Sequence, residues 1–400
     1  MATDPISIVE ARERVLSCSR RLGRETVAIE QALGRVLAQN VYAAGEVPPF
    51  PSSAMDGYAL EAGPAGRRLT VVGQSRAGAP FAGALRVDEA IRISTGAAVP
   101  PSAPAVIRQE DVDAGEGMIV TNVSLAAGEN VRAAGEDMRP GSKVLAAGAT
   151  VGAPELGVAV AAGAAELIVA RRPTVAVLCT GDELRAPGEP LGPGQIHNSN
   201  APMLAALASR AGAVVLAEKR VADDLGATED SLGAALRRAD VVVVSGGVSV
   251  GPHDHLKRAL ADLGVREQFW RVALQPGGPT WFGELDGRLV FGLPGNPVSA
   301  YVTFSLFARP AIAALQGAST VSTLDSEALL GVAVARNRTR ERALRVRLER
   351  RDGSTIAVPN GPQGSHILTS LVGADALALI PPGEGELAAG SHIALERLPR

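Results

Sequence analysis

The pattern of hydrophobic and polar positions changes several times along the chain, and each change predicts a different kind of structure. Two runs near the N-terminus, 6–19 and 25–39, have apolar residues at helical spacing with charges between them, which predicts two helices. From about 47 to 150 the chain consists of short runs broken by glycine and proline. The runs "RLTVVGQS", "AIRISTGA", "APAVIRQED" and "GMIVTNVS" predict strands of a β-rich unit. The segment 140–164 then turns back toward helix.

A regular alternation of strands and helices begins at residue 174. The run 174–179 is continuously apolar, as expected of a strand buried on both faces of a parallel sheet. A helix, a strand, a helix and a strand follow as far as residue 247, which predicts a doubly wound α/β domain. After a further helix at 253–264, three extended runs lead into a helix at 297–316. The final segment, 318–400, alternates short strands with turns and predicts a small β-domain.

Composition narrows the class of protein. A chain of 400 residues with 46% hydrophobic and 20% charged residues is typical of two to four globular domains. A net charge of −3 and an aromatic content of 3% give no case for a nucleic-acid or anionic-membrane partner. The two cysteines, Cys18 and Cys179, match no metal-ligand spacing and suit a reducing compartment. With neither a signal-peptide pattern nor a long enough apolar run, we expect a cytoplasmic protein.

Three predicted strands of the α/β domain end in loops of small residues. These are "CTGDEL" at 179–184, "SGGVSVG" at 245–251 and "GLPGNP" at 292–297. In open α/β sheets, ligands bind outside the carboxyl ends of the strands, and glycines let backbone N–H groups approach phosphate. The three loops therefore predict an anionic, phosphate-bearing ligand. The usual P-loop and dinucleotide signatures are absent from the sequence, which disfavours an ordinary kinase, ATPase or dehydrogenase.

Acidic residues accompany these loops and have two interpretations. Asp182 and Glu183 follow the first strand, Asp223 and Asp224 the second, and Asp254 the glycine loop. Each is by default a helix N-cap, since aspartate is a favoured capping residue. Carboxylates at neighbouring strand ends beside phosphate loops also suit Mg²⁺, which bridges to phosphate oxygens. The sequence pattern alone leaves both interpretations open.

Another carboxylate, Asp56, lies outside the α/β domain in the stretch "SSAMDGYALE" at 52–61. The pair Asp56–Gly57 is most simply a surface turn. The alternative is a carboxylate held on a tight backbone corner beside a ligand. Three basic residues of the α/β domain, Lys257, Arg258 and Arg271, are equally ambiguous, because each suits an anion contact or a solvated face.

Eight motifs in order resemble a known family. They are "PPFPSSAMDGYAL", "IRISTGAAVPPSAPAVIRQED", "VRAAGEDMRPGSKVL", "CTGDEL", "GQIHNSN", "SGGVSVGPHDHLK", "FWRVALQPGGP" and "GLPGNPVSAYVTF", and the C-terminal run "GPQGSHILTSLVGADALALIPPGEGELAAGSHIALERL" is similar to the family's last domain as well. This succession resembles the molybdopterin molybdenumtransferases, the MoeA family, which is related to a half of gephyrin. The resemblance covers nearly the whole chain.

The resemblance implies a multidomain fold of the α/β plus β class. We expect a discontinuous helical linking region (1–50 with 136–172), a β-rich inserted domain (51–135), a doubly wound molybdopterin-binding α/β domain (173–317) and a C-terminal β-barrel (318–400). It also implies an elongated homodimer. The active site would lie between the α/β domain of one protomer and the β-rich domain of the other.

The reaction implied by the resemblance inserts molybdenum into adenylylated molybdopterin, with molybdate as the metal source, Mg²⁺ as the cofactor and AMP as the product. A related α/β enzyme that adenylylates molybdopterin is a competing interpretation, but such proteins lack the other three parts. The remaining alternative is a catalytically impaired paralogue that acts as a molybdopterin-binding or scaffold protein.

The family motifs also imply roles for individual residues. Those tied to activity are Asp56, Thr95, Glu183, Asp223 and Asp254, with Asp182, Glu183 and Asp254 on the metal side. Those implied to bind substrate are Arg132, Thr180, Gly181, Ser245, Gly246, Gly247, Ser249, Lys257, Arg271, Pro294, Gly295, Asn296 and Pro297.

Two departures from the family pattern stand in the loop "QPGGP". Gly278 takes the place of a residue that is commonly basic, and Gln275 takes the place of one that is often lysine. Because fewer cations would weaken the attraction of molybdate, we expect either a slower enzyme or a specialised paralogue.

Overall fold

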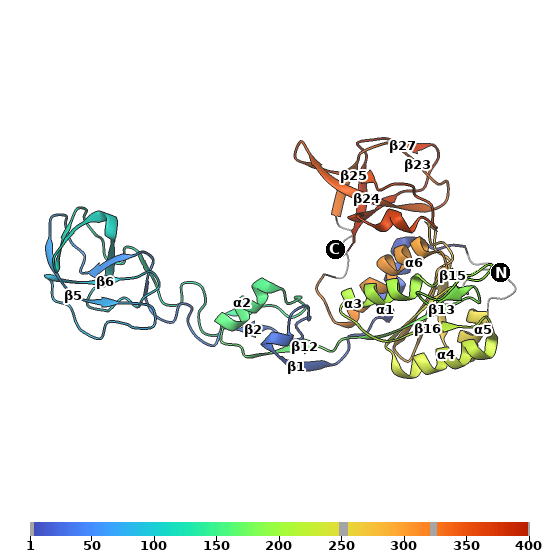
Figure 1. Cartoon of the computed structure of the whole chain (residues 1–400), viewed down its shortest axis with the longest axis horizontal. Helices are drawn as coiled ribbons and strands as arrows, with labels where there is room; N and C mark the ends of the chain where they lie inside the picture. Colours follow the sequence, from blue (N-terminus) through green and yellow to red (C-terminus); the bar gives the residue numbers. More distant parts are fainter. Residues whose placement is uncertain (1–3, 248–254, 321–325, 399–400) are drawn as a thin grey trace.

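The computed structural model describes residues 4–247, 255–320 and 326–398. The molecule is elongated (Figure 1). A β-rich unit lies at one end, a small linking unit in the middle, and an α/β unit with a β-barrel against it at the other end. The boundaries of the four predicted domains remain predictions.

A six-stranded sheet forms the centre of the α/β unit. Its order is β16 (Val214–Val221), β13 (Thr174–Thr180), β17 (Val241–Ser245), β21 (Arg288–Leu293), β20 (Trp281–Leu285) and β18 (Arg266–Trp270). The first four strands are parallel, and β20 and β18 extend the sheet in antiparallel fashion. The carboxyl ends of the four parallel strands therefore meet at one edge.

Helices cover both faces of this sheet. Alternate residues of β13 belong to different cores, with Val175 and Val177 in one and Ala176 and Leu178 in the other. The first core includes α1 (Ile8–Cys18), α3 (Asn200–Arg210), α6 (Pro297–Thr303) and α7 (Arg309–Leu315), and the second includes α4 (Leu225–Arg238) and α5 (His255–Asp262). This arrangement confirms the doubly wound α/β prediction.

The helical segment Pro297–Leu315 is the most apolar helix of the α/β unit. A π-helical segment, η3 (Phe304–Ala308), connects α6 to α7 within it. By length and composition it could cross a membrane, but 78% of its most apolar window is buried inside the structure. The segment is therefore a core helix of the α/β unit that packs against its sheet.

One N-terminal prediction is wrong. The run 25–39 was expected to be a helix, but it begins as strand β1 (Arg24–Ala28), which pairs with β12 (Glu166–Ala170), and continues as a 3₁₀ turn, Ile29–Gln31. Gly34, at φ 74°, adopts a left-handed conformation that no helix continues through. The helical spacing of the apolar residues was overridden by pairing with a strand about 140 residues away.

The linking unit joins chain segments from before and after the β-rich unit. Besides the β1–β12 pair, β2 (Val41–Tyr42) pairs with β11 (Lys143–Leu145). The helix expected within 140–164 is present as α2 (Ala153–Ala161). By contrast, α1 packs on the α/β sheet, where Ile8 and Val15 are buried. The helices expected together near the linking region are thus divided between two units.

The β-rich unit contains a second six-stranded sheet, which confirms the four strands predicted there. Its order is β7 (Ala105–Arg108), β4 (Gly57–Leu60), β6 (Glu89–Ile93), β5 (Arg68–Ser75), β9 (Met118–Thr121) and β8 (Val112–Gly115). A short strand pair joins the two chain segments that flank this sheet. Strand β3 (Ser52–Ser53), just before β4, pairs with β10 (Val131–Arg132), which follows β9.

The C-terminal strands form a closed barrel, as predicted. Strand β24 (Glu341–Arg351) pairs with both β25 (Ser354–Pro359) and β26 (Ala376–Ile380), while β22 (Ser326–Leu330) and β28 (His392–Arg397) complete the ring. Strand β19 (Leu274–Gln275), from the loop after β18, pairs in parallel with the start of β24. The remaining short elements are β14 (Leu184–Arg185), β15 (Ile196–His197), β23 (Val334–Ala335), β27 (Glu386–Leu387) and the 3₁₀ turns Gln109–Asp111 and Leu368–Leu371.

A buried ionic cluster fastens the barrel to the α/β unit. Glu396 of β28 is fully buried and accepts hydrogen bonds from Arg12 of α1, at 2.8 Å, and from Arg309 of α7. Three elements from distant parts of the chain therefore converge on one carboxylate.

Candidate functional site

The strand-end cleft lies where the parallel strands of the α/β sheet finish. The register places Thr180 opposite Val221, and Ser245 opposite both Cys179 and Leu293. The loops that follow enclose a cleft of about 500 Å³. It is lined by Cys179, Thr180, Glu183, Leu184, Ile196, His197, Asn198, Ser199, Asn200, Ser245, Gly247, Pro279, Pro294, Gly295, Asn296 and Pro297.

Most of the residues predicted to bind substrate lie together at this cleft. Glycine is required at 246, because a Cβ there would lie 2.9 Å from the Thr180 carbonyl oxygen and 2.7 Å from the Thr180 hydroxyl. Gly246 and Gly181 both have positive φ, at 96° and 147°. The loop after β17 thus approaches the end of β13 more closely than a side chain would permit. Ser249 lies outside the described residues.

Asn200, at the start of α3, ties two of these loops together. Its Nδ2 donates to the Ser245 hydroxyl at 2.9 Å and to the Gly295 carbonyl at 2.7 Å, and the Ser245 hydroxyl donates to the Pro294 carbonyl at 3.2 Å. With both amide protons committed, Oδ1 is buried and has no hydrogen-bond partner among the described residues. Sequence analysis did not single out Asn200, although it stands in the motif "GQIHNSN".

The carboxylates near the cleft divide between capping and exposed positions. Asp224 caps α4, since its side chain accepts from the Ala227 N–H at 2.8 Å. Asp182 and Asp223 are exposed at neighbouring strand ends, and the Asp223 N–H lies 3.4 Å from Asp182 Oδ1. Glu183 is also exposed and lines the cleft.

The predicted metal set was Asp182, Glu183 and Asp254, of which Asp254 lies outside the described residues. In the described part of the chain, no three His, Cys, Asp or Glu side chains form a metal-binding group. Asp182 and Asp223 nevertheless lie in loops at adjacent strand ends, where the Asp223 N–H is 3.4 Å from Asp182 Oδ1, and each has an exposed carboxylate. Because Mg²⁺ usually binds one or two carboxylates together with substrate phosphates and waters, this donor set fits it.

A second group of predicted residues, Asp56, Thr95 and Arg132, lies in the β-rich unit. Asp56 Oδ1 accepts from the Thr95 N–H at 2.7 Å and from its hydroxyl at 3.1 Å. The Thr95 backbone hydrogen bond, followed by its hydroxyl, lowers the pKa of Asp56. Arg132, which is exposed, pairs with Ser52 in the β10–β3 ladder. Asp56 is therefore an exposed, ionised carboxylate held at a fixed place.

The glycine beside Asp56 is explained by close packing. A Cβ on Gly57 would lie 1.9 Å from the Ile107 carbonyl oxygen on the neighbouring strand β7. The residue is thus part of strand β4, and the Asp-Gly pair marks the start of that strand. Figure 1 places the β-rich unit, which includes Asp56, at the opposite end of the molecule from the α/β unit, so one protomer does not bring Asp56 to the strand-end cleft.

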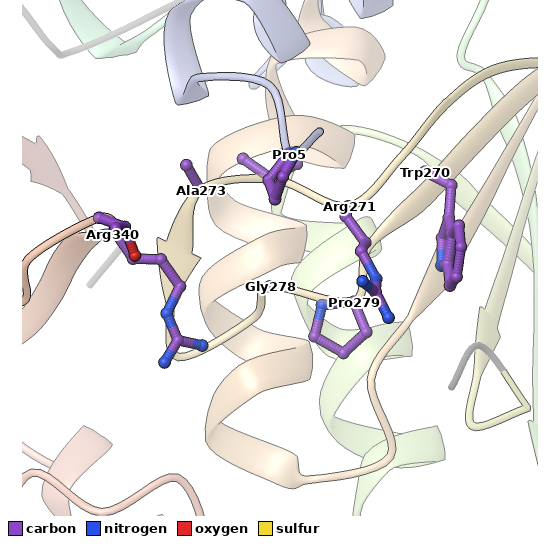
Figure 2. Close-up of a pocket in the computed structure, with 9 residues that line it drawn as sticks. Pro5, Trp270, Arg271, Ala273, Gly278, Pro279 and Arg340 are labelled. Carbon is purple, nitrogen blue, oxygen red and sulfur yellow. The ribbon is translucent and has the colours of Figure 1, made fainter. Parts of the chain in front are cut away.

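Two predicted cationic residues lie beside Trp270. The Lys257 Nζ is 2.9 Å from the centroid of the Trp270 ring, and the Arg271 guanidinium carbon is 4.4 Å from it. Neither residue lines the strand-end cleft. Arg271 instead lines an outer cleft of about 570 Å³ on the other side of the 274–279 loop (Figure 2).

An arginine cleft of about 290 Å³ separates the 274–279 loop from the barrel. It is lined by Arg340, Arg342 and Arg345, and it shares the residues Pro279, Pro294 and Asn296 with the strand-end cleft. The two clefts are therefore neighbours. Sequence analysis missed all three arginines, since they belong to the barrel and to no family motif that it used.

Arg345 is an unusual buried cation. Its side chain is fully buried, and burial, together with the charge of Arg342, lowers its pKa to about 10. Nε donates to the Ser370 hydroxyl at 3.1 Å and Nη2 to the Gly364 carbonyl at 3.2 Å. Nη1 is buried without a hydrogen-bond partner among the described residues. A buried guanidinium with an unused N–H group beside a cleft is well suited to an anion.

Comparison with known proteins agrees with this architecture. Residues 6–163 match the MoeA N-terminal region (domain I and II), 176–314 a probable molybdopterin binding domain, and 327–398 the MoeA C-terminal region (domain IV). The chain is 37% identical over 402 residues to Molybdopterin molybdenumtransferase 2 of Mycobacterium tuberculosis, covering 96% of this chain and 98% of the relative. It is 34% identical over 390 residues to Molybdopterin molybdenumtransferase of Bacillus subtilis, covering 95% and 91%.

A solved structure gives the same result in three dimensions. The crystal structure of the molybdopterin biosynthesis MoeA protein from Pyrococcus horikosii superimposes with a TM-score of 0.80 at 32% identity, covering 98% of this chain and 99% of that one. Family regions, relatives and structure all span nearly the full length. The chain therefore belongs to the MoeA family.

Proposed function

We propose that this protein inserts molybdenum into adenylylated molybdopterin, taking the metal from molybdate and releasing AMP. Membership of the family assigns it a transferase role in molybdenum cofactor biosynthesis. The observation that carries the finer proposal is the adjacency of two chemically different clefts. One has glycine loops suited to phosphate, and the other has three arginines suited to an oxyanion.

The geometry suggests how the two substrates share the site. The phosphates of adenylylated molybdopterin would lie against the glycine loops at 181 and 246–247, where backbone N–H groups can approach them. Molybdate would occupy the arginine cleft, where Arg340, Arg342 and Arg345 supply positive charge. The shared wall, Pro279, Pro294 and Asn296, then separates the oxyanion from the pterin by one layer of residues.

Asp182 and Asp223 are the described residues that would hold Mg²⁺, with Glu183 beside them. Bound there, Mg²⁺ would neutralise phosphate charge as the phosphoanhydride bond breaks. The chain's own contribution is to hold these carboxylates exposed at the strand ends. The glycine loops orient the phosphates, and Asn200 fixes the spacing between the loops after β17 and β21.

The site would be completed by a second copy of the chain. Asp56, Thr95 and Arg132 lie far from the cleft of their own protomer, yet their side chains are exposed and Asp56 is fixed in position. In a homodimer, Asp56 of the partner subunit would reach the ligand in the strand-end cleft. A cytoplasmic location belongs to the same proposal.

A catalytically impaired scaffold is the alternative function, favoured by Gly278 and Gln275 in a loop that is commonly more basic. Release of AMP from adenylylated molybdopterin distinguishes the two. With purified protein and Mg²⁺, the transferase releases AMP in proportion to the molybdate added, and Asp56→Ala or Glu183→Ala abolishes this release. Asp262→Ala, a matched control that removes an exposed carboxylate of α5, retains it. Pterin binding without release at any molybdate concentration would instead establish the scaffold.

A further inference from the structure

The outer cleft has a guanidinium on each side of the Gly278–Pro279 turn. Figure 2 shows Arg340, from the start of the barrel, on one side of this turn and Arg271 on the other. Arg340 also lines the arginine cleft, so the same side chain borders both spaces. In the part of the chain that the structure describes, neither arginine forms an ion pair with a carboxylate.

Arg271 is held in the cleft against a conformational preference. Its φ of 76° is unfavourable for a residue with a side chain. The conformation is maintained by hydrogen bonds from the Arg271 N–H to the Thr280 carbonyl, 2.9 Å, and from the Ile6 N–H to the Arg271 carbonyl, 3.3 Å. Stacking near Trp270, at 4.4 Å, then directs the guanidinium into the outer cleft.

Gly278 lies close to the guanidinium of Arg340. A Cβ built on Gly278 would lie 3.9 Å from Arg340 Nη1 and 3.3 Å from the Leu274 carbonyl oxygen. A longer basic side chain at 278 would therefore extend into space that the Arg340 guanidinium already borders. The Arg340 N–H donates to Asn337 Oδ1 at 3.0 Å, and Asn337 Nδ2 donates to Gln275 Oε1 at 2.8 Å. Gln275 thus links the loop to the barrel segment that carries Arg340.

We propose that Arg340 supplies the positive charge that residue 278 lacks, so that the glycine leaves room for a cation from the barrel. The proposal rests on the oxyanion site of the proposed function. It predicts that a lysine at 278 would not raise the affinity for molybdate: beside Arg340, a second cation adds like-charge repulsion to a site that already has its charge. Arg340 acts here on the anion directly, and Gln275 acts through Asn337 as a positioning residue.

The test is a mutant cycle on the full-length protein, with molybdate alone as the probe and binding measured by isothermal titration calorimetry. Arg340→Gln is expected to weaken molybdate binding about tenfold, as for loss of a charged hydrogen bond. Gly278→Lys alone is expected to leave the affinity unchanged or weaker. The double variant Gly278→Lys/Arg340→Gln should bind within about threefold of wild type, because the lysine now replaces the missing charge.

A control variant isolates the charge effect. Arg338→Gln removes an exposed arginine two residues away from Arg340. It should bind molybdate as wild type does, and thermal denaturation confirms that each variant is folded. Tighter binding by Gly278→Lys with Arg340 present, unchanged binding by Arg340→Gln, or no molybdate binding by wild type would each overturn the proposal. The molybdate-binding measurement needs no pterin. If the mutant cycle gave the expected affinities but the AMP-release assay failed, only the proposed function would be rejected.

Discussion

Removing the charge of Glu396 should loosen the barrel from the α/β unit. The Glu396 side chain is fully buried, and the side chains of its partners Arg12 and Arg309 are 6% and 19% exposed. In Glu396→Gln the shape is retained, but two guanidinium groups are left without their counter-charge. Breaking a buried ion pair by removing one partner typically costs about 3–5 kcal/mol. We expect a loss of that size in the free energy of unfolding of the α/β unit.

The assay follows tryptophan fluorescence during urea unfolding. Both tryptophans, Trp270 and Trp281, lie in strands of the α/β sheet, so the signal reports on that unit. With an m-value on the order of 3 kcal/mol/M, the expected loss lowers the urea midpoint by about 1–2 M. Molybdate binding should weaken in parallel, because the barrel carries the arginines of the oxyanion cleft.

The matched control is Glu349→Gln on the same barrel. Its ion pair with Arg351 is exposed, at 44% and 57%, and such pairs contribute about 0–1 kcal/mol. Replacing Arg12, Glu396 and Arg309 together by methionine should recover most of the stability, since well-packed apolar residues can replace a buried triad. If Glu396→Gln unfolded at the same urea concentration as Glu349→Gln, the argument that this cluster fastens the barrel would be refuted.

Two further predictions concern buried titratable groups. Although burial raises the pKa of Asp240, hydrogen bonds from Arg171 and Thr174 outweigh it and hold that pKa below the ordinary value. The resulting stability is present above about pH 4 and is lost as pH falls through the native pKa of Asp240. The variant Asp240→Asn should therefore unfold at a lower urea midpoint than wild type at pH 7 and at the same midpoint in acid. Equal midpoints at pH 7 would contradict this. Burial raises the pKa of Cys179 to about 11, so at pH 8 a disulfide reagent should label it only after unfolding, whereas half-buried Cys18 serves as the internal comparison. Rapid labelling of native Cys179, located by mass spectrometry, would show that the strand-end core opens readily.

The α/β part of the fold was predictable because its signals are local. A continuous apolar run such as 174–179 has few alternatives to a doubly buried strand, and ligands of open α/β sheets bind outside the carboxyl ends of such strands. The register that places Ser245 beside Cys179 and Leu293 then follows from the sheet itself. The strand-end cleft could therefore be located, in outline, without coordinates.

What sequence could not supply depends on contacts between distant segments. The apolar spacing in 25–39 resembled a helix, but β1 is set by its pairing with β12. In the sequence, Arg345 is one of several charged residues in a strand of alternating polar and apolar positions. Only closure of the barrel buries its guanidinium beside the 274–279 loop. Likewise, the place of Arg340 beside Gly278 arises from parallel pairing of β19 with β24, about 65 residues later in the chain.

The most direct test of the central claim is molybdate-dependent AMP release by mixed dimers. Asp56→Ala and Glu183→Ala chains, each inactive alone, are co-expressed with different tags and assayed with adenylylated molybdopterin. If the site is shared between protomers, half of the dimers are mixed and each has one intact site, so about a quarter of wild-type activity should return. No recovery in purified mixed dimers would contradict a site built from the α/β unit of one chain and Asp56 of the partner subunit.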